Sequence, residues 1–172
     1  GGVIVAFAHG SYIRVMHDKR TVVGYTTRNS GGVPDNFKNW FIVRFDRKIR
    51  DFQIYDGTKP VGGEQLVGEH ALVRVGFETR RGEQVTVRAA SSFISQMQAV
   101  QNLEELGKDD FETVKSKAQA RWDEVLGRIE VAGGTVDQYR TFYSCLYRST
   151  LFPRKFYEID KNGNILHYSP YN

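Results

Sequence analysis

The sequence predicts an α+β fold in which part of an antiparallel β-sandwich is followed by amphipathic helices. Up to Phe93, short runs of β-branched and aromatic residues are separated by turns that contain glycine. From Ser95 onward, apolar residues instead recur at spacings of three and four, which is the period of an α-helix. The 172 residues suffice for one ordinary domain, or for a smaller domain and the beginning of another.

Seven runs in the first part of the chain have the length and composition of strands. In the last run, the alternation places Val85, Val87 and Ala89 on one face and Arg88 on the other, as a half-buried sheet requires. The predicted strands are Val3–Phe7, Ser11–Met16, Thr21–Thr27, Trp40–Phe45, Arg50–Tyr55, Ala71–Glu78 and Gln84–Ala90.

Glycine marks the predicted turns and loops of the sandwich. The segment Arg80–Glu83 predicts a hairpin turn between the last two strands, because Gly82 adopts a positive φ easily. Two further segments, Asn29–Pro34 and Pro60–Glu64, are predicted to be surface loops. Neither carries the Lys-Ser/Thr pair of a phosphate loop or leads from a strand into a helix.

The first of these loops and the residues that flank it supply the candidate substrate-binding residues, which are Arg28, Asn29, Asp35 and Asn36. Loops often carry binding residues, and the charged and amide groups of these side chains suit sugar hydroxyls. The alternative explanation is that these polar residues serve only to form turns.

Three helices are predicted after the sandwich, each with residue types that favour a helix terminus. They begin at Ser95, near Asp109 or Asp110, and at Thr135, and the breakers that follow the second and third are Gly133-Gly134 and Pro153. The third helix gathers aromatic residues on one predicted packing face, which consists of Tyr139, Phe142, Tyr143, Leu146 and Tyr147. Three such helices expose more apolar surface than they can bury together, so we expect a longer polypeptide with a larger helical body.

A hairpin is predicted after the helices, pairing Phe156–Asp160 with Ile165–Ser169 through a type I′ turn at Asn162-Gly163. The alternation of oxygen-bearing residues in Asp160–Asn164 is also typical of the start of a calcium loop. The rest of the EF-hand pattern is missing, since Tyr171 stands where a glutamate is required. The hairpin is therefore the favoured interpretation.

Composition excludes several classes of site. The 24 basic and 20 acidic residues give a net charge of +4 that is spread along the chain, which argues against a nucleic-acid partner. No apolar run approaches the roughly 20 residues of a membrane span, and the first residues lack the pattern of a secretion signal. The single cysteine, Cys145, is expected to be a small buried thiol. The four histidines lack zinc-ligand spacing; they are His9, His17, His70 and His167.

Several motifs occur in an order that resembles the bacterial α-mannosidases of glycoside hydrolase family 92. The segments that carry the resemblance are "GYTTRNSGG", "NWFIVRFDRKI", an S-x-x-S-x-x-x-A-x-x-N-L motif at Ser92, Ser95, Ala99, Asn102 and Leu103, a W-x-x-x-L-x-x-I motif at Trp122, Leu126 and Ile129, and an aromatic helix motif at Phe142, Tyr143, Leu146, Tyr147 and Pro153. These motifs cover most of the chain.

The resemblance implies an N-terminal β-sandwich joined to a larger (α/α)6 barrel, with the active site at the junction between them. By this comparison, residues 1–93 are the C-terminal part of the sandwich, residues 94–133 form linking helices, and residues 134–172 begin an incomplete barrel. The resemblance further implies that the complete protein is a calcium-dependent, exo-acting α-mannosidase. By this resemblance we expect it to hydrolyse terminal α-linked mannose with inversion, including α-1,2 linkages and N-glycans, in the periplasm, at the cell surface or outside the cell.

The same resemblance places the catalytic acid, the base and the calcium ligands beyond Asn172, so no catalytic or metal-binding residue is assigned here. The chain alone is expected to be inactive, and its expected partners are mannose-containing glycans and the remainder of its own polypeptide. Two alternatives stay open. One is a carbohydrate-binding β-sandwich without catalysis, which requires an exposed aromatic platform, and the other is an interaction module that assembles through its apolar helix faces.

Overall fold

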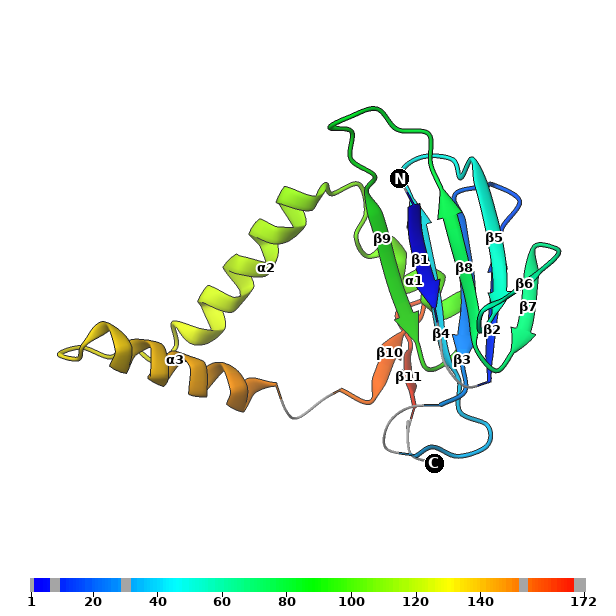
Figure 1. The fold of residues 1–172 in the computed structure, drawn as a ribbon. Coiled ribbons are helices and arrows are strands. Elements are labelled where there is room, and N and C mark those ends of the chain that lie inside the picture. Colours follow the sequence, from blue (N-terminus) through cyan, green and yellow to red (C-terminus); the bar gives the residue numbers. More distant parts are fainter. Residues whose placement is uncertain (1, 7–9, 29–31, 152–154, 169–172) are drawn as a thin grey trace. The chain divides into compact units, whose positions relative to one another are not determined.

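The computed structural model describes residues 2–6, 10–28, 32–151 and 155–168. Within these ranges the chain forms strands β1 to β11 and helices α1 to α3 (Figure 1). It divides into two compact units, one made of residues 1–105 with 156–172, and the other of residues 106–155. The first unit contains all the strands and α1, and the second contains α2 and α3.

The first unit is built on two antiparallel sheets, as the sequence predicts. The four-stranded sheet has the order β1 (Gly2–Ala6), β8 (Ala71–Gly76), β5 (Asp51–Asp56) and β6 (Lys59–Val61). The five-stranded sheet has the order β7 (Gln65–Gly68), β2 (Ser11–Val15), β3 (Thr21–Thr26), β4 (Asn39–Phe45) and β9 (Val87–Ser92).

The core lies between these sheets. Alternate residues of β2 are buried, because successive side chains of a strand point to opposite faces. The inward side chains form one cluster, to which the five-stranded sheet contributes Ile13, Val15, Val22, Phe41 and Phe45, and the four-stranded sheet contributes Ile54, Ala71, Val73 and Val75. The predicted β-sandwich is therefore confirmed.

Gly24, in the middle of β3, allows close packing within this core. A Cβ atom at this position would lie 2.0 Å from the Tyr12 carbonyl oxygen and 2.6 Å from a ring carbon of Phe41. No other residue fits here without a shift of the backbone or the ring. The glycine thus lets the Phe41 ring lie directly against the strand.

Helix α1 (Gln96–Glu104) packs against β4 and β9, on the face of the five-stranded sheet that is turned away from the core. Ile42, Ala99 and Leu103 are buried there, outside the cluster between the sheets. The predicted helix start is confirmed, because the Ser95 hydroxyl accepts a hydrogen bond from the Gln98 amide at 3.0 Å.

The connection from β8 to β9 differs from the prediction. A turn does form at Arg80–Glu83, with Gly82 at φ +86° and a 3.2 Å hydrogen bond from the Glu83 amide to the Arg80 carbonyl. The strands on either side of it are in different sheets, however, so the connection is a crossover and the hairpin prediction is wrong. Both edges of β8 are already paired, with β1 and β5, which leaves no edge for β9.

Two further strand predictions are corrected. Strand β9 begins at Val87, and the side chains of Val87 and Ala89 are exposed because β9 lies at the edge of its sheet. The segment Pro60–Glu64 is not wholly a loop, since Pro60 and Val61 belong to β6. A proline is tolerated there because β6 is also an edge strand.

The predicted C-terminal hairpin is confirmed in β10 (Tyr157–Ile159) and β11 (Ile165–His167), but its turn is not type I′. Type I′ requires positive φ at both central residues, and Lys19 is the one non-glycine residue with positive φ in the described ranges. Instead, Asp160 closes a five-residue loop. Its Oδ1 accepts hydrogen bonds from the amides of Asn162 and Asn164, each at 2.8 Å.

The second unit contains α2 (Phe111–Leu126) and α3 (Val136–Thr150). Asp110 caps α2, and Thr135 with Gln138 forms the predicted capping box of α3. Helix α2 ends at Leu126, before the predicted Gly133-Gly134 stop, because Gly127 is already its C-terminal cap. The rings of Trp122 and Tyr147 lie 4.7 Å apart between the two helices.

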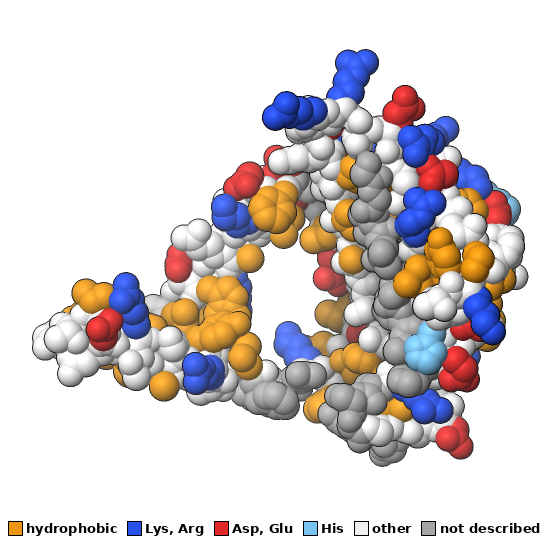
Figure 2. All heavy atoms as spheres, viewed as in Figure 1, with side chains coloured by type: hydrophobic (Ala, Val, Ile, Leu, Met, Phe, Trp, Pro, Cys, Tyr) orange, Lys and Arg blue, Asp and Glu red, His pale blue; other side chains and the backbone are white. Residues whose placement is uncertain are grey.

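Neither helix of this unit buries a residue, and all residues of both are described. Figure 2 shows apolar side chains on the surface of this helical unit, and Phe111, Val136 and Leu151 are among the exposed ones. Cys145 is exposed, so the prediction of a buried thiol is wrong. Its position on α3 has the apolar spacing of a core residue, but this unit does not cover it.

Candidate functional site

The loop between β3 and β4 forms a hollow of about 480 Å³ at one end of the sandwich. Arg28 and Asp35, two of the four predicted binding residues, both line it, and both are exposed. Asn36 is exposed but is not part of the lining, and Asn29 lies outside the described residues. The described lining residues are Thr27, Arg28, Gly32, Val33, Pro34 and Asp35.

Both ends of this loop are held in place. At the start, the hydroxyl of Thr27 donates a 2.7 Å hydrogen bond to the Gly10 carbonyl. At the other end, Phe37 is 7% exposed and its ring centroid lies 5.8 Å from that of Phe93. Phe93 in turn stacks on Tyr168, which follows β11, at 4.9 Å. The hollow is therefore fixed to the segment that carries the C-terminal hairpin.

The chemistry of the hollow suits binding of a polar ligand. The Arg28 guanidinium offers donors in a planar fork, and the Asp35 carboxylate offers acceptors, so neighbouring hydroxyl groups of a sugar can be held by both. Glycosidic hydrolysis requires two carboxyl groups with different roles. Asp35 is the single carboxylate among the described residues that line the hollow. The hollow therefore fits sugar binding and does not by itself form a hydrolytic pair.

A second group of residues, here called the polar junction, consists of Gln98, Asn102 and Glu158. The side-chain amide of Gln98 donates to the Ile159 carbonyl at 2.7 Å and to Asn102 Oδ1 at 2.9 Å. Asn102 Nδ2 donates to Glu158 Oε2 at 2.8 Å. The other oxygen of Glu158 accepts from the Phe93 amide at 2.9 Å. These contacts join α1, the end of β9 and the hairpin.

Sequence reasoning did not find the polar junction as a unit. Gln98 and Asn102 are separated by one helical turn, and this spacing of two amide side chains was the available signal. Their partner Glu158 is 56 residues from Asn102 along the chain, in an ordinary strand alternation. Nothing local to Glu158 indicates that it meets α1.

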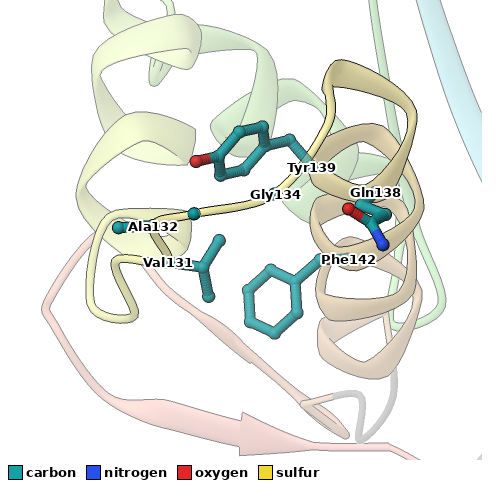
Figure 3. Close-up of a pocket in the computed structure, with 7 residues that line it drawn as sticks. Val131, Ala132, Gly134, Gln138, Tyr139 and Phe142 are labelled. Atoms are coloured by element: carbon teal, nitrogen blue, oxygen red, sulfur yellow. The ribbon is translucent and has the colours of Figure 1, made fainter.

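A further hollow, of about 400 Å³, lies in the helical unit (Figure 3). The rings of Tyr139 and Phe142 project from α3 toward the loop with Val131 and Ala132. Gln138 also lines it, but its Oε1 accepts a 2.8 Å hydrogen bond from the Thr135 amide as part of the helix cap. The described lining residues offer no carboxylate, histidine or cysteine for catalysis; they are Val131, Ala132, Gly133, Gly134, Gln138, Tyr139 and Phe142.

The described residues do not form a metal centre. No group of three or more histidine, cysteine, aspartate or glutamate side chains is placed to hold an ion within the described ranges. Asp160, in the segment with partial calcium-loop alternation, binds its own loop instead. Hydrogen bonds from the Asn164 side chain and amide lower the pKa of Asp160 below its usual value. Within the same ranges, no helix has the length and apolar character to cross a membrane.

Two family models match the chain. The glycosyl hydrolase family 92 N-terminal domain matches residues 3–92, and the glycosyl hydrolase family 92 catalytic domain matches residues 98–172. A relative from Arthroderma benhamiae, named an uncharacterized secreted glycosidase, is 40% identical in an alignment of 77 residues that covers 42% of this chain and 10% of that protein.

Solved structures agree with these matches. A family 92 inverting mannosidase from Bacteroides thetaiotaomicron VPI-5482 superposes with a TM-score of 0.92 and 41% identity, over 99% of this chain and 24% of that one. A family 92 α-mannosidase from Bacteroides thetaiotaomicron gives a TM-score of 0.78 and 25% identity, over 95% of this chain and 24% of that one. The chain thus spans about a quarter of the length of these mannosidases. With its N-terminal-domain match alone covering residues 3–92 of 172, the chain belongs to glycosyl hydrolase family 92.

Proposed function

We propose that this chain is the sandwich and the first catalytic-domain segment of an exo-acting α-mannosidase, which removes terminal α-linked mannose from glycans. The observation that carries this proposal is the likeness to the inverting mannosidase, at 41% identity over 99% of the chain. The hollow with Arg28 and Asp35 supports it, since its donors and acceptors suit the hydroxyl groups of a sugar.

The reaction we propose is hydrolysis with inversion. A carboxylic acid protonates the leaving glycosidic oxygen, while a carboxylate activates a water molecule on the opposite face of the sugar ring. The two carboxyl groups stand about 6.5–9.5 Å apart to admit that water. Because the chain spans 24% of the matched mannosidase, we assign both groups to the rest of a family 92 polypeptide.

The residues of this chain would then bind and position. Arg28 and Asp35 hold hydroxyl groups of the glycan from the side of the sandwich. The polar junction holds the hairpin against α1. Neither role requires that a bond of the substrate be broken by a residue of this chain.

A calcium ion is part of the proposal for the complete enzyme. Calcium binds six to eight oxygen ligands, and when bound to the enzyme it would hold mannose hydroxyls. The described residues of this chain do not fit such a site. We therefore propose that the remaining polypeptide provides the ligands.

The natural substrates and the location are proposed from the same family relation. We propose α-1,2-linked mannose of N-glycans as a substrate, and export to the periplasm, the cell surface or the medium of a bacterial cell. The name of the Arthroderma benhamiae relative, a secreted glycosidase, supports export.

The test is hydrolysis of aryl glycosides by a polypeptide that joins this chain to the rest of a family 92 catalytic domain. We expect release from the aryl α-mannoside and not from the aryl α-glucoside, loss of activity on chelation, and recovery with calcium. The variant Asp35→Asn is expected to raise KM with a smaller effect on kcat, and Glu69→Gln, at an exposed position outside the hollow, is its control. Cleavage of the glucoside alone, or mannose release by residues 1–172 alone, would overturn the proposal.

A further inference from the structure

Three aromatic side chains form a row across the five-stranded sheet. Tyr12 on β2 is directly opposite Tyr25 on β3, and Tyr25 is directly opposite Trp40 on β4. The ring centroids are 5.4 Å apart in the first pair and 4.7 Å apart in the second. These three residues are called the aromatic row below.

The aromatic row lies on the face of the sheet that is turned away from the core. The neighbours Ile13 and Phe41 are buried in the cluster between the sheets, and adjacent residues of a strand point to opposite faces. The three aromatic side chains are only partly buried. Helix α1 packs on β4 and β9, near the edge of the sheet that is farther from β7. Beyond Tyr12, the row continues to Val67, which is 71% exposed.

Hydrogen-bonding groups lie over these rings and at one end of the row. The Lys38 ammonium is 4.7 Å from the ring centroid of Tyr25 and 5.3 Å from that of Trp40. The Tyr12 hydroxyl donates to Gln65 Oε1 at 3.2 Å. A pyranose ring has an apolar C–H face with hydroxyl groups around its rim, so it needs an aromatic surface bordered by donors and acceptors. The aromatic row offers this combination. A purely apolar protein partner would bury these polar groups without offering them hydrogen bonds, which is unfavourable.

The aromatic row is close in sequence to residues that line the hollow described above. Thr27, which lines the hollow, follows Tyr25 by two residues, and Lys38 follows Asp35 by three. Three adjacent strands span roughly 10 Å between the outer two, given the usual strand spacing. A short oligosaccharide can therefore lie along the row.

We propose that the aromatic row binds an α-linked mannan chain. The identity of the sugar rests on the proposed function, and the position of the surface rests on the row itself. Bound there, a polymeric substrate is retained beside the enzyme while its terminal residues are removed.

Fluorescence tests this proposal directly, because the chain has two tryptophans. In the full chain with Trp122→Phe, Trp40 is the one remaining tryptophan. Titration with α-linked mannotriose is expected to change its emission saturably, and cellotriose is not. The further substitution Tyr25→Leu is expected to weaken binding about tenfold, as loss of one ring contact predicts. Tyr55→Leu, in the other sheet, is the matched control and is expected to bind normally.

An unchanged Trp40 emission with mannotriose overturns the proposal, as does equal affinity of the Tyr25→Leu variant and its parent. If Tyr25→Leu does not fold, which its thermal transition reveals, the Trp40 titration alone decides. Hydrolysis of an aryl α-mannoside by the longer polypeptide is measured separately. Hydrolysis without binding at Trp40 rejects the aromatic row only, and binding without hydrolysis rejects the proposed function only.

Discussion

Glu158 contacts two segments that are distant from it in the sequence, through the Phe93 amide and the Asn102 side chain. Glu158→Ala would leave both donors without this acceptor, in a partly buried place. Urea denaturation is expected to show a loss of about 1–3 kcal/mol in the free energy of unfolding of the sandwich unit. Glu69→Ala, at an exposed position of the same unit, is the control and is expected to stay within about 0.5 kcal/mol of the parent. Equal stabilities of the two variants would show that the polar junction does not hold the hairpin.

Gly24 is a second residue whose role is decided by a single contact. Gly24→Ala places a methyl group against the Tyr12 carbonyl and the Phe41 ring, so we expect a loss of about 3 kcal/mol or more. Gly62→Ala is the control, since a Cβ atom there meets open space. Thermal denaturation distinguishes the two. A Gly24→Ala protein as stable as Gly62→Ala would contradict the packing of Phe41 on β3.

Asp160 makes the hairpin turn sensitive to pH. Hydrogen bonds from the Asn164 side chain and amide lower the pKa of Asp160, so the folded turn favours the ionised carboxylate. The contribution of this carboxylate to folding stability is fully present above the pKa that Asp160 has in the unfolded chain. It is lost as the pH falls through the lower pKa that Asp160 has in the folded chain. The amide NMR shifts of Asn162 and Asn164 should therefore titrate below the ordinary aspartate range, and Asp160→Asn should remove this titration. A midpoint at or above the usual value would contradict the hydrogen-bonded turn.

Helices α2 and α3 differ from the strands of the core in how many of their residues are buried. Neither helix has a buried residue, whereas β2, β3 and β4 contribute Ile13, Val22 and Phe41 to the core. Opening of a segment is easier where fewer apolar contacts are lost. In the chain of 172 residues, amides of the two helices are expected to exchange with deuterium well before those of the three strands. Equal protection of helices and strands would show that the helical unit is stable by itself.

At the level of elements, local patterns in the sequence are sufficient for most of the fold. The helix caps at Ser95 and Thr135 and the alternation in β2 each depend on neighbouring residues, and these predictions are confirmed. The partner of β9 depends on which sheet edges are free, and the turn at Gly82 contains no information on that. Strand β6 was missed because Pro60 favours a loop wherever the strand is not known to be at an edge.

The candidate site also has a part that local sequence predicts and a part that it does not. Arg28 and Asp35 are near each other in sequence, on one loop, and their shared hollow follows from that. The polar junction and the aromatic row depend on pairs such as Glu158 with Asn102 and Tyr25 with Trp40. Such pairs arise from the register of strands and the docking of a helix, which a single sequence does not specify.

Across the whole molecule, the two family domains and the two compact units do not coincide. The catalytic-domain match begins at residue 98, within α1, and it also includes the hairpin, yet both belong to the sandwich unit. The catalytic domain of the family therefore begins on the surface of the sandwich in this chain. Through Phe93 and Tyr168, the same region holds the loop with Arg28 and Asp35.

We propose that this chain is part of an inverting α-mannosidase and acts with the rest of a family 92 polypeptide. Proton NMR of the first turnovers tests it most directly, because the anomeric signal of newly released mannose identifies the configuration before mutarotation. With an aryl α-mannoside and the polypeptide that joins this chain to a family 92 catalytic domain, we expect β-mannose to appear first. α-Mannose as the first product, or no release of mannose, would contradict the account.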